Sequence, residues 1–382
     1  MVAGATIFCL AALEIGLRIY YHRHDVLART GFHMLWHPLF ASLGQPGSEG
    51  PASSSEWRYT LRANAEGFRE NLHDLSKTGS IVVLGDSYVW GTGLEETQRF
   101  SNILSDLLAT NVLNYGLCTD GTINELAVYA YFAEKRKPSQ VILAFYANDV
   151  QNNLWWLGQI GVQNVTNPAA YWQAMAQRAR IPASWPDEAN LIEPKMGGSA
   201  LGYFVREALR KMRAQKDLEK TVPVTLPSGA TVRVNEQMIQ GDHYLSPALT
   251  LNTQALDYGW KMTATTLGIL KKRMDDQNVK FLVVYIPLGE KIHPDLGKAR
   301  KKWMGLTCPD ELLDPDRPRR DLEKIARELH IDFLDLTPAL SKEIEKTGAH
   351  MCYPFDWHLT PAGNRVVAQA LAEHLRGGSK PE

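Results

Sequence analysis

Short apolar runs alternate with amphipathic stretches along the chain from residue 80 onward. Five runs are short enough to be buried strands, at 81–84, 112–115, 141–146, 279–286 and 331–334. Between them, apolar residues recur at helical spacing, as at Phe100, Ile103, Leu104, Leu107 and Leu108. This alternation predicts a three-layer α/β/α sandwich, in which helices cover both faces of about five parallel strands.

Further helical stripes complete this pattern, at 123–131, 260–274, 322–329 and 366–375. The last of these helices has a clear start signal. Thr360 is a suitable N-cap, and Pro361 suits the first helical position. The sequence therefore predicts that the chain ends on a helix packed against the sheet.

The interval 151–256 interrupts the alternation. It is far too long for a loop in a compact domain, so we expect an inserted subdomain or lid there. Within it, residues 222–234 have the composition of a β-hairpin that turns at Ser228 and Gly229.

The amino terminus has a different character. Residues 2–21 are mostly apolar and about as long as the ~20 residues that span a bilayer, so we expect a membrane anchor at 1–21. Glu14 and Arg18 interrupt the run, but they lie four apart and can pair on one helical face. An amphipathic helix lying on a surface is the alternative. Residues 22–79 are rich in His, Pro, Gly and Ser, and we expect an irregular stem and lead-in.

Charge and cysteine content narrow the function classes. The 41 basic and 42 acidic residues give a formal net charge of -1, which disfavours nucleic-acid binding. The four cysteines have no metal-ligand spacing with histidine. Cys308 and Cys352 would be able to form a disulfide in an exported domain, but scattered thiols fit a reduced protein equally well.

Polar residues with catalytic chemistry stand where the predicted strands end. Gly85-Asp86-Ser87 follows the first strand, Asn148-Asp149 follows the third, and Asp356-Trp357-His358 precedes the last helix. Taken singly, Ser87 would be a helix N-cap, Asn148 a turn residue and His358 a packed surface histidine. Their joint occurrence at strand ends favours a serine-ester hydrolysis site.

Each residue has a place in that chemistry. Ser87 is the candidate nucleophile, His358 the general base, and Asp356 the carboxylate that orients it. In an extended segment residues i and i+2 point to the same side, which brings Asp356 to His358. Candidate oxyanion donors are the backbone N–H groups of Ser87 and Gly116 and the side-chain amide of Asn148.

These motifs resemble the SGNH/GDSL hydrolase family over roughly residues 80–376. The family places its serine in G-D-S, its glycine after the second strand, its asparagine in G-x-N-D and its histidine in D-x-x-H. Ser87, Gly116, Asn148 and His358 match these positions in order. There are two departures: Tyr146 replaces the glycine of G-x-N-D, and Asp356 lies two residues before the histidine rather than three.

The resemblance implies a flavodoxin-like hydrolase domain at 80–378, which needs no cofactor and whose Asp86 and Asp149 support the site. We expect a membrane-anchored, bacterial-type enzyme outside the cytoplasmic membrane, although Arg18, Arg23 and Arg29 follow the apolar run and the positive-inside rule argues for the cytoplasm.

The expected reaction is hydrolysis of acyl esters, preferably acetyl esters of a carbohydrate. A polysaccharide O-acyltransferase with the same triad is the alternative, followed by a non-catalytic glycan-binding protein. Trp90, Trp155 and Trp156 either stack on sugar rings or pack in the interior.

Overall fold

The computed structural model describes residues 2–24, 34–37, 40–118, 121–159, 190–191, 219–226 and 228–377, with a few positions between 201 and 216. Five parallel strands form the central sheet in the order β12-β11-β7-β5-β6. These are β5 (Ile81–Gly85), β6 (Val112–Gly116), β7 (Gln140–Phe145), β11 (Lys280–Tyr285) and β12 (Asp332–Asp335). All five predicted strands are thereby confirmed.

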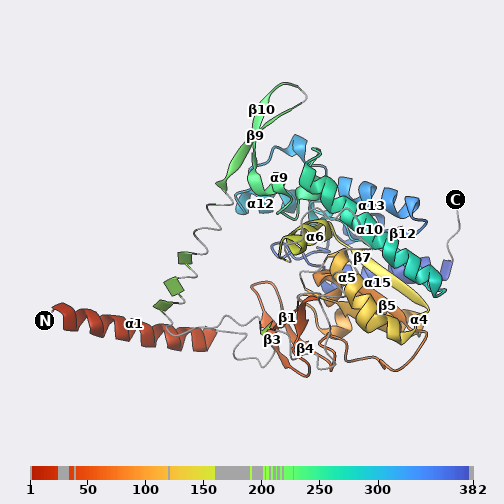
Figure 1. Cartoon of the computed structure of the whole chain (residues 1–382), viewed down its shortest axis with the longest axis horizontal. Helices are drawn as coiled ribbons and strands as arrows, with labels where there is room; N and C mark the ends of the chain where they lie inside the picture. The colour runs from red at the N-terminus through yellow and green to blue at the C-terminus, as the bar shows by residue number, and fades with distance from the viewer. Residues whose placement is uncertain are drawn as a thin grey trace.

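Helices cover both faces of the sheet (Figure 1). Alternate strand residues point to opposite sides, so Val82 and Leu84 join one apolar core and Ile81 and Val83 the other. The first core is completed by α5 (Thr122–Val128), α10 (Gln254–Asp276) and α13 (Arg317–Glu328). The second is completed by α4 (Phe100–Leu108), α14 (Thr337–Thr347) and α15 (Pro361–Gly377). The three-layer α/β/α architecture is confirmed.

The remaining helices are short or lie at the edges of these layers. They are α3 (Ser87–Trp90), α6 (Asn148–Gln159), α9 (Glu236–Gln240), α11 (Gly289–Ile292) and α12 (Pro294–Trp303), with the single turns η1 (Glu96–Gln98), η2 (Tyr129–Ala133), η3 (Glu134–Arg136), η4 (Ser246–Ala248) and η5 (Asp310–Leu312). Helix α15 begins as predicted, because the Thr360 hydroxyl accepts the N–H of Gly363 at 3.2 Å.

The described part of the insertion contains the expected hairpin. Strands β9 (Thr221–Thr225) and β10 (Thr231–Asn235) pair antiparallel, and Gly229 in the turn has φ +84°. Figure 1 shows this hairpin projecting from the top of the α/β body. Residues 151–159, which we expected at the start of the insertion, belong to α6, and this helix packs against α10. Residues 160–189 and 192–200 lie outside the described part.

The lead-in is more ordered than expected. Strand β1 (Met34–His37) pairs with β2 (Ala41–Gly44) and with β8 (Asn190–Leu191), and β3 (Glu49–Ser53) pairs with β4 (Arg58–Arg62). Phe40, Leu43 and Phe68 are fully buried in the first core. An irregular stem over 22–79 is therefore wrong from residue 40 onward, where the chain is part of the domain.

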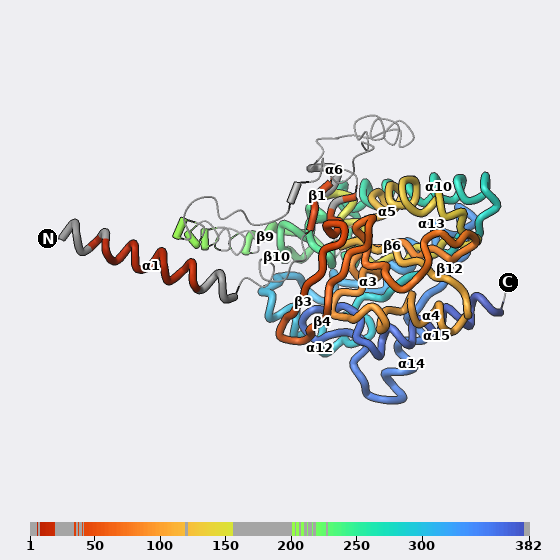
Figure 2. The backbone as a smooth tube through the Cα atoms, turned by 90° about the horizontal axis from the view of Figure 1, so that it is seen from below, coloured from red at the N-terminus to blue at the C-terminus, as the bar shows by residue number. Residues whose placement is uncertain are grey.

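Helix α1 (Val2–His24) projects away from this body (Figure 2). The predicted pair within it is confirmed, since Arg18 Nε donates to Glu14 Oε1 at 2.7 Å. Across the described residues, no helix combines the length and the apolar character needed for a membrane span. The membrane anchor is thus not confirmed, and the location outside the cytoplasmic membrane stays a prediction.

Candidate active site

The first polar residues after β5 form a sharp turn into α3. The Asp86 carboxylate caps this helix by accepting the N–H of Tyr88 at 2.9 Å, so Asp86 rather than Ser87 is the N-cap. A side chain at Gly85 would place Cβ 2.8 Å from the carbonyl oxygen of Ala144. Because Asp86 does the capping, the hydroxyl of Ser87 is left to contact other groups.

The turn brings Ser87 to the histidine and the aspartate predicted from the sequence. His358 Nε2 lies 2.8 Å from Ser87 Oγ, and His358 Nδ1 is hydrogen-bonded to Asp356 Oδ1. A neutral imidazole that donates from Nδ1 to the carboxylate accepts the Ser87 hydroxyl proton at Nε2. The three side chains, from segments about 270 residues apart in the sequence, therefore form one continuous hydrogen-bonded chain.

Asp356 is electrostatically suited to orient the base. Burial raises the pKa of its carboxyl group, but the hydrogen bond and the charge of His358 act in the opposite direction and leave the pKa below its ordinary value. Asp356 is therefore ionised at neutral pH.

Two of the three candidate oxyanion donors belong to Ser87 and Asn148. The N–H of Ser87 has no acceptor among the described residues, as is normal for the first turn of a helix. Asn148 begins α6 directly after β7, and its amide is close enough to Asp86 to lower that residue's pKa. Both groups lie at the carboxyl ends of the adjacent strands β5 and β7, where the strand order reverses.

The third candidate donor, the N–H of Gly116, has a partner within its own strand. Its N–H donates to the Asn114 side-chain oxygen at 3.1 Å. It is a glycine for a steric reason, because a Cβ there would lie 2.4 Å from the backbone nitrogen of Trp90. Gly116 therefore lets helix α3 pack closely on β6.

Asp86, which precedes Ser87, and Glu125 form a pair of buried carboxyl groups. Asp86 is fully buried, and burial raises its pKa. Glu125 on α5 is also buried, and neither of its carboxyl oxygens has a partner in the described chain. Burial, followed by the nearby charge of Asp86, raises the pKa of Glu125 well above its ordinary value. On the other side, Asp149 accepts the backbone N–H of Tyr146 at 3.2 Å and so supports the turn that carries Asn148.

We expect Glu125→Gln to stabilise the protein, and to do so more at high pH. A carboxyl whose pKa is raised by folding favours the folded state below its unfolded pKa, and this contribution is lost as the pH rises through the folded pKa. The neutral amide does not titrate. The difference in melting temperature between the variant and the parent should grow between about pH 6 and about pH 9, and a constant difference would contradict a buried, titrating Glu125.

A residue of the lead-in, which no motif marks, holds the loop that carries Asp356. Glu56 lies between β3 and β4, and its carboxylate accepts the backbone N–H of Asp356 at 2.7 Å and that of Phe355 at 3.1 Å. These contacts span 300 residues of sequence, so local patterning gives no signal for them. Glu56 fixes the backbone on which the triad acid is carried.

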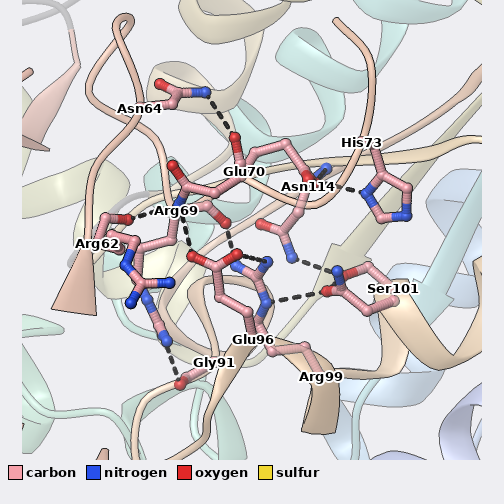
Figure 3. A network of polar contacts seen from close by, with 12 residues as sticks. Arg62, Asn64, Arg69, Glu70, His73, Gly91, Glu96, Arg99, Ser101 and Asn114 are labelled. Atoms are coloured by element: carbon pink, nitrogen blue, oxygen red, sulfur yellow. Dashed lines mark hydrogen bonds and ion pairs between the residues drawn. The ribbon is translucent and has the colours of Figure 1, made fainter. Parts of the chain in front are cut away.

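A buried polar network ties the lead-in to the nucleophile helix (Figure 3). Arg69 is 1% exposed, and its guanidinium donates to the carbonyl oxygens of Trp90, Gly91 and Leu94 at 2.8–2.9 Å. Trp90 and Gly91 are the last residue and the C-cap of α3. Arg69 therefore satisfies carbonyl groups that the end of this short helix would otherwise leave unpaired.

The same network reaches strand β6 (Figure 3). Glu70 Oε2 accepts the backbone N–H of Asn114 at 2.7 Å, and its other oxygen contacts His73 Nδ1 at 2.8 Å. The Arg99 guanidinium donates to the carbonyl oxygen of Arg69. Burial, together with the charge of Arg99, lowers the pKa of Arg69 to about 10. The arginine remains charged at neutral pH.

The sequence alone leaves two questions open: whether the three tryptophans stack on sugar rings or pack inside, and whether Cys308 and Cys352 form a disulfide. Trp90 is 1% exposed and packs in the core, so it cannot stack on a sugar. Trp155 is 44% exposed on α6, and the side chain of Trp156 lies outside the described residues. Cys308 and Cys352 are both buried, and each is a free thiol.

Residues 249–382 match the model of a protein family described as the SGNH hydrolase-like domain of the acetyltransferase AlgX. The matched segment contains Asp356 and His358. Ser87, Asn148, Glu56 and Arg69 lie before it. No curated protein sequence matches the chain.

Solved structures show only distant likeness. The α/β hydrolase LAE5 from the metagenome of Lake Arreo is 12% identical with a TM-score of 0.38, covering 78% of this chain and 96% of its own. The acetylxylan esterase Axe2 from Geobacillus stearothermophilus is 13% identical with a TM-score of 0.37, covering 78% and 94%. Likeness at this level carries no inference about activity.

Proposed function

We propose that the chain belongs to the SGNH/GDSL hydrolase family and that it acts on acyl esters through an acyl-enzyme on Ser87. The observation that carries the proposal is the chain of hydrogen bonds from Ser87 through His358 to Asp356. Such a chain converts a weakly nucleophilic hydroxyl into one that attacks an ester. It also argues against a non-catalytic protein whose site has decayed.

Each group has one task in the proposed reaction. Ser87 Oγ attacks the acyl carbon while its proton passes to His358 Nε2. The Ser87 N–H and the Asn148 amide stabilise the negative oxygen of the tetrahedral intermediate. His358 then gives the proton to the departing alkoxide, and Asp356 stabilises the imidazolium formed in between. Water or a second alcohol completes the cycle by the same steps in reverse.

We propose that the preferred acyl group is acetyl, carried by or transferred to a carbohydrate. Support comes from the family description, which names an acetyltransferase. The first test is release of p-nitrophenol from acetyl and longer-chain p-nitrophenyl esters. We expect turnover to be highest for the acetyl ester, and a preference for long acyl chains would contradict the proposal.

A surface feature favours a carbohydrate acceptor. Phe355 directly precedes Asp356 in the sequence, and its side chain is 55% exposed. Its ring contacts that of Trp303, which is 69% exposed, with the two ring centroids 5.8 Å apart. Trp303 ends α12, which also carries the exposed Lys298 and Lys302. Apolar ring faces left open beside a reactive group suit the C–H face of a pyranose.

We therefore expect Trp303→Ala to reduce acetyl transfer to an oligosaccharide relative to transfer to water. Loss of one stacking surface should lower this ratio roughly tenfold. With p-nitrophenyl acetate as the donor, the measurement compares the amount of acetylated cello- or xylo-oligosaccharide with the amount of free acetate. The rate at which a fluorophosphonate labels Ser87 checks that the site is intact. An unchanged ratio would exclude Trp303 from acceptor binding.

A further inference from the structure

Trp357 stands between the two triad residues in an unusual backbone conformation. Its φ is +68°, in the left-handed region that a bulky residue rarely adopts. Asp356 and His358 therefore do not meet across an extended segment, as the sequence argument assumed, but across a left-handed turn. Strained conformations of this kind persist only where the surrounding structure holds them.

The indole of Trp357 is held on all sides. It is 2% exposed, and its Nε1 donates to Glu290 Oε1 at 3.1 Å. The guanidinium of Arg300 lies 5.0 Å from the centroid of the Trp357 ring. Gly289 also lies against the ring, since a Cβ there would be only 2.5 Å from the nearest indole carbon. These contacts hold the ring in place.

Glu290, which accepts the Trp357 indole N–H, is itself held by a second hydrogen bond. The hydroxyl of Tyr244 donates to the same Oε1 atom at 2.7 Å. Arg300 also lies 5.0 Å from the Tyr244 ring, so its guanidinium contacts both aromatic groups. The Trp357 indole thus packs against a partly buried cluster of one carboxyl, one guanidinium and one phenol.

The backbone of Trp357 is tied to the nucleophile. Its carbonyl oxygen accepts the hydroxyl of Tyr88 at 3.0 Å, and Tyr88 directly follows Ser87. The N–H of Trp357 donates to the carbonyl oxygen of Tyr353 at 3.0 Å. The N–H of Tyr353 in turn donates to the carbonyl oxygen of His358 at 2.9 Å. A shift of Trp357 would therefore move His358 relative to Ser87.

We propose that Trp357 is a positioning residue, whose indole bond to Glu290 and carbonyl bond from Tyr88 hold the shortened Asp-x-His segment in register with Ser87. The inference rests on the proposed serine mechanism. It explains how two-residue spacing serves in place of three: the left-handed turn at Trp357 directs both flanking side chains to one side, and the buried indole prevents the turn from relaxing.

The test uses Trp357→Phe, which keeps the ring but removes the N–H, and Tyr88→Phe, which removes only the hydroxyl. Because a displacement of about 1 Å in a catalytic group costs up to ~100-fold, we expect each variant to lose roughly 10–100-fold in kcat for p-nitrophenyl acetate with KM unchanged. Both changes act on one residue, so the double variant should be about as slow as the slower single variant. Labelling of Ser87 by a fluorophosphonate should slow by the same factor.

Trp260→Phe is the matched control, since Trp260 lies on α10 on the other face of the sheet and its Nε1 has no hydrogen-bond partner in the described chain. Proton NMR of His358 Nδ1–H reports the contact with Asp356 independently of turnover. Its low-field resonance should weaken in Trp357→Phe and stay unchanged in Trp260→Phe. The inference would be overturned if Trp357→Phe kept the parent's kcat and the parent's His358 Nδ1–H resonance. It would also be overturned if the effects of Trp357→Phe and Tyr88→Phe on kcat multiplied in the double variant. A parent protein that neither turns over nor is labelled would instead refute the serine mechanism.

Discussion

Ser87→Ala should lower kcat/KM for p-nitrophenyl acetate by at least about 10³-fold, because it removes the atom that carries the acyl group. The kcat/KM of His358→Ala should fall by a similar factor, since His358 Nε2 lies 2.8 Å from Ser87 Oγ and is placed to take the hydroxyl proton. Residues that act as one unit have non-additive effects, so the double variant should be no slower than either single one.

Asp356→Asn should lower kcat/KM as well, because Asp356 orients His358. The amide is nearly isosteric but favours the wrong imidazole tautomer, so we expect a loss of roughly 10²–10⁴-fold with the protein still folded. Initial rates across the four variants, with circular dichroism to confirm folding, make the measurement. A folded Ser87→Ala protein that keeps a tenth or more of the parent rate would place the nucleophile elsewhere.

Arg69→Met should be among the most destabilising single changes in the protein. The side chain is fully buried and is the partner of three carbonyl groups around the end of α3. Removing one member of a buried charged network costs about 3–5 kcal/mol of unfolding free energy. For a domain of this size that corresponds to a fall of roughly 6–20 °C in melting temperature. Calorimetry or thermal unfolding followed by circular dichroism measures it.

Arg62→Met is the control for this prediction. Arg62 comes from the same lead-in and pairs with Glu49 at 2.8 Å, but both side chains are about half exposed. Surface pairs of this kind contribute little, so we expect no measurable change in melting temperature. Equal behaviour of the two variants would mean that the lead-in is a separable stem, as its composition suggested, rather than part of the domain.

The α/β body was predictable because burial imposes strong local patterns. A strand covered on both faces must be apolar throughout, as 81–84 is, and a helix on the sheet must repeat its apolar residues every three or four positions. The strand ends then place Ser87 and Asn148 side by side without further information. His358 and Asp356 were found from their residue types and order.

The rest of the site depends on contacts that leave no local trace. Glu56 and Arg69 are single polar residues in a segment without periodicity, and their partners lie 21 to 300 residues away. A glycine at a strand end likewise does not reveal where its N–H points, and that of Gly116 donates to the Asn114 side-chain oxygen. The left-handed turn at Trp357 is likewise invisible, because tryptophan normally avoids it.

The most direct test of the account is to find the acyl group on the enzyme. The protein is mixed with p-nitrophenyl acetate, quenched in acid within the first turnovers, digested and analysed by mass spectrometry. We expect one acetylated peptide, in which Ser87 carries the modification, and no such peptide from His358→Ala. Continued turnover with an unmodified Ser87, or acetylation of another residue at the catalytic rate, would contradict it.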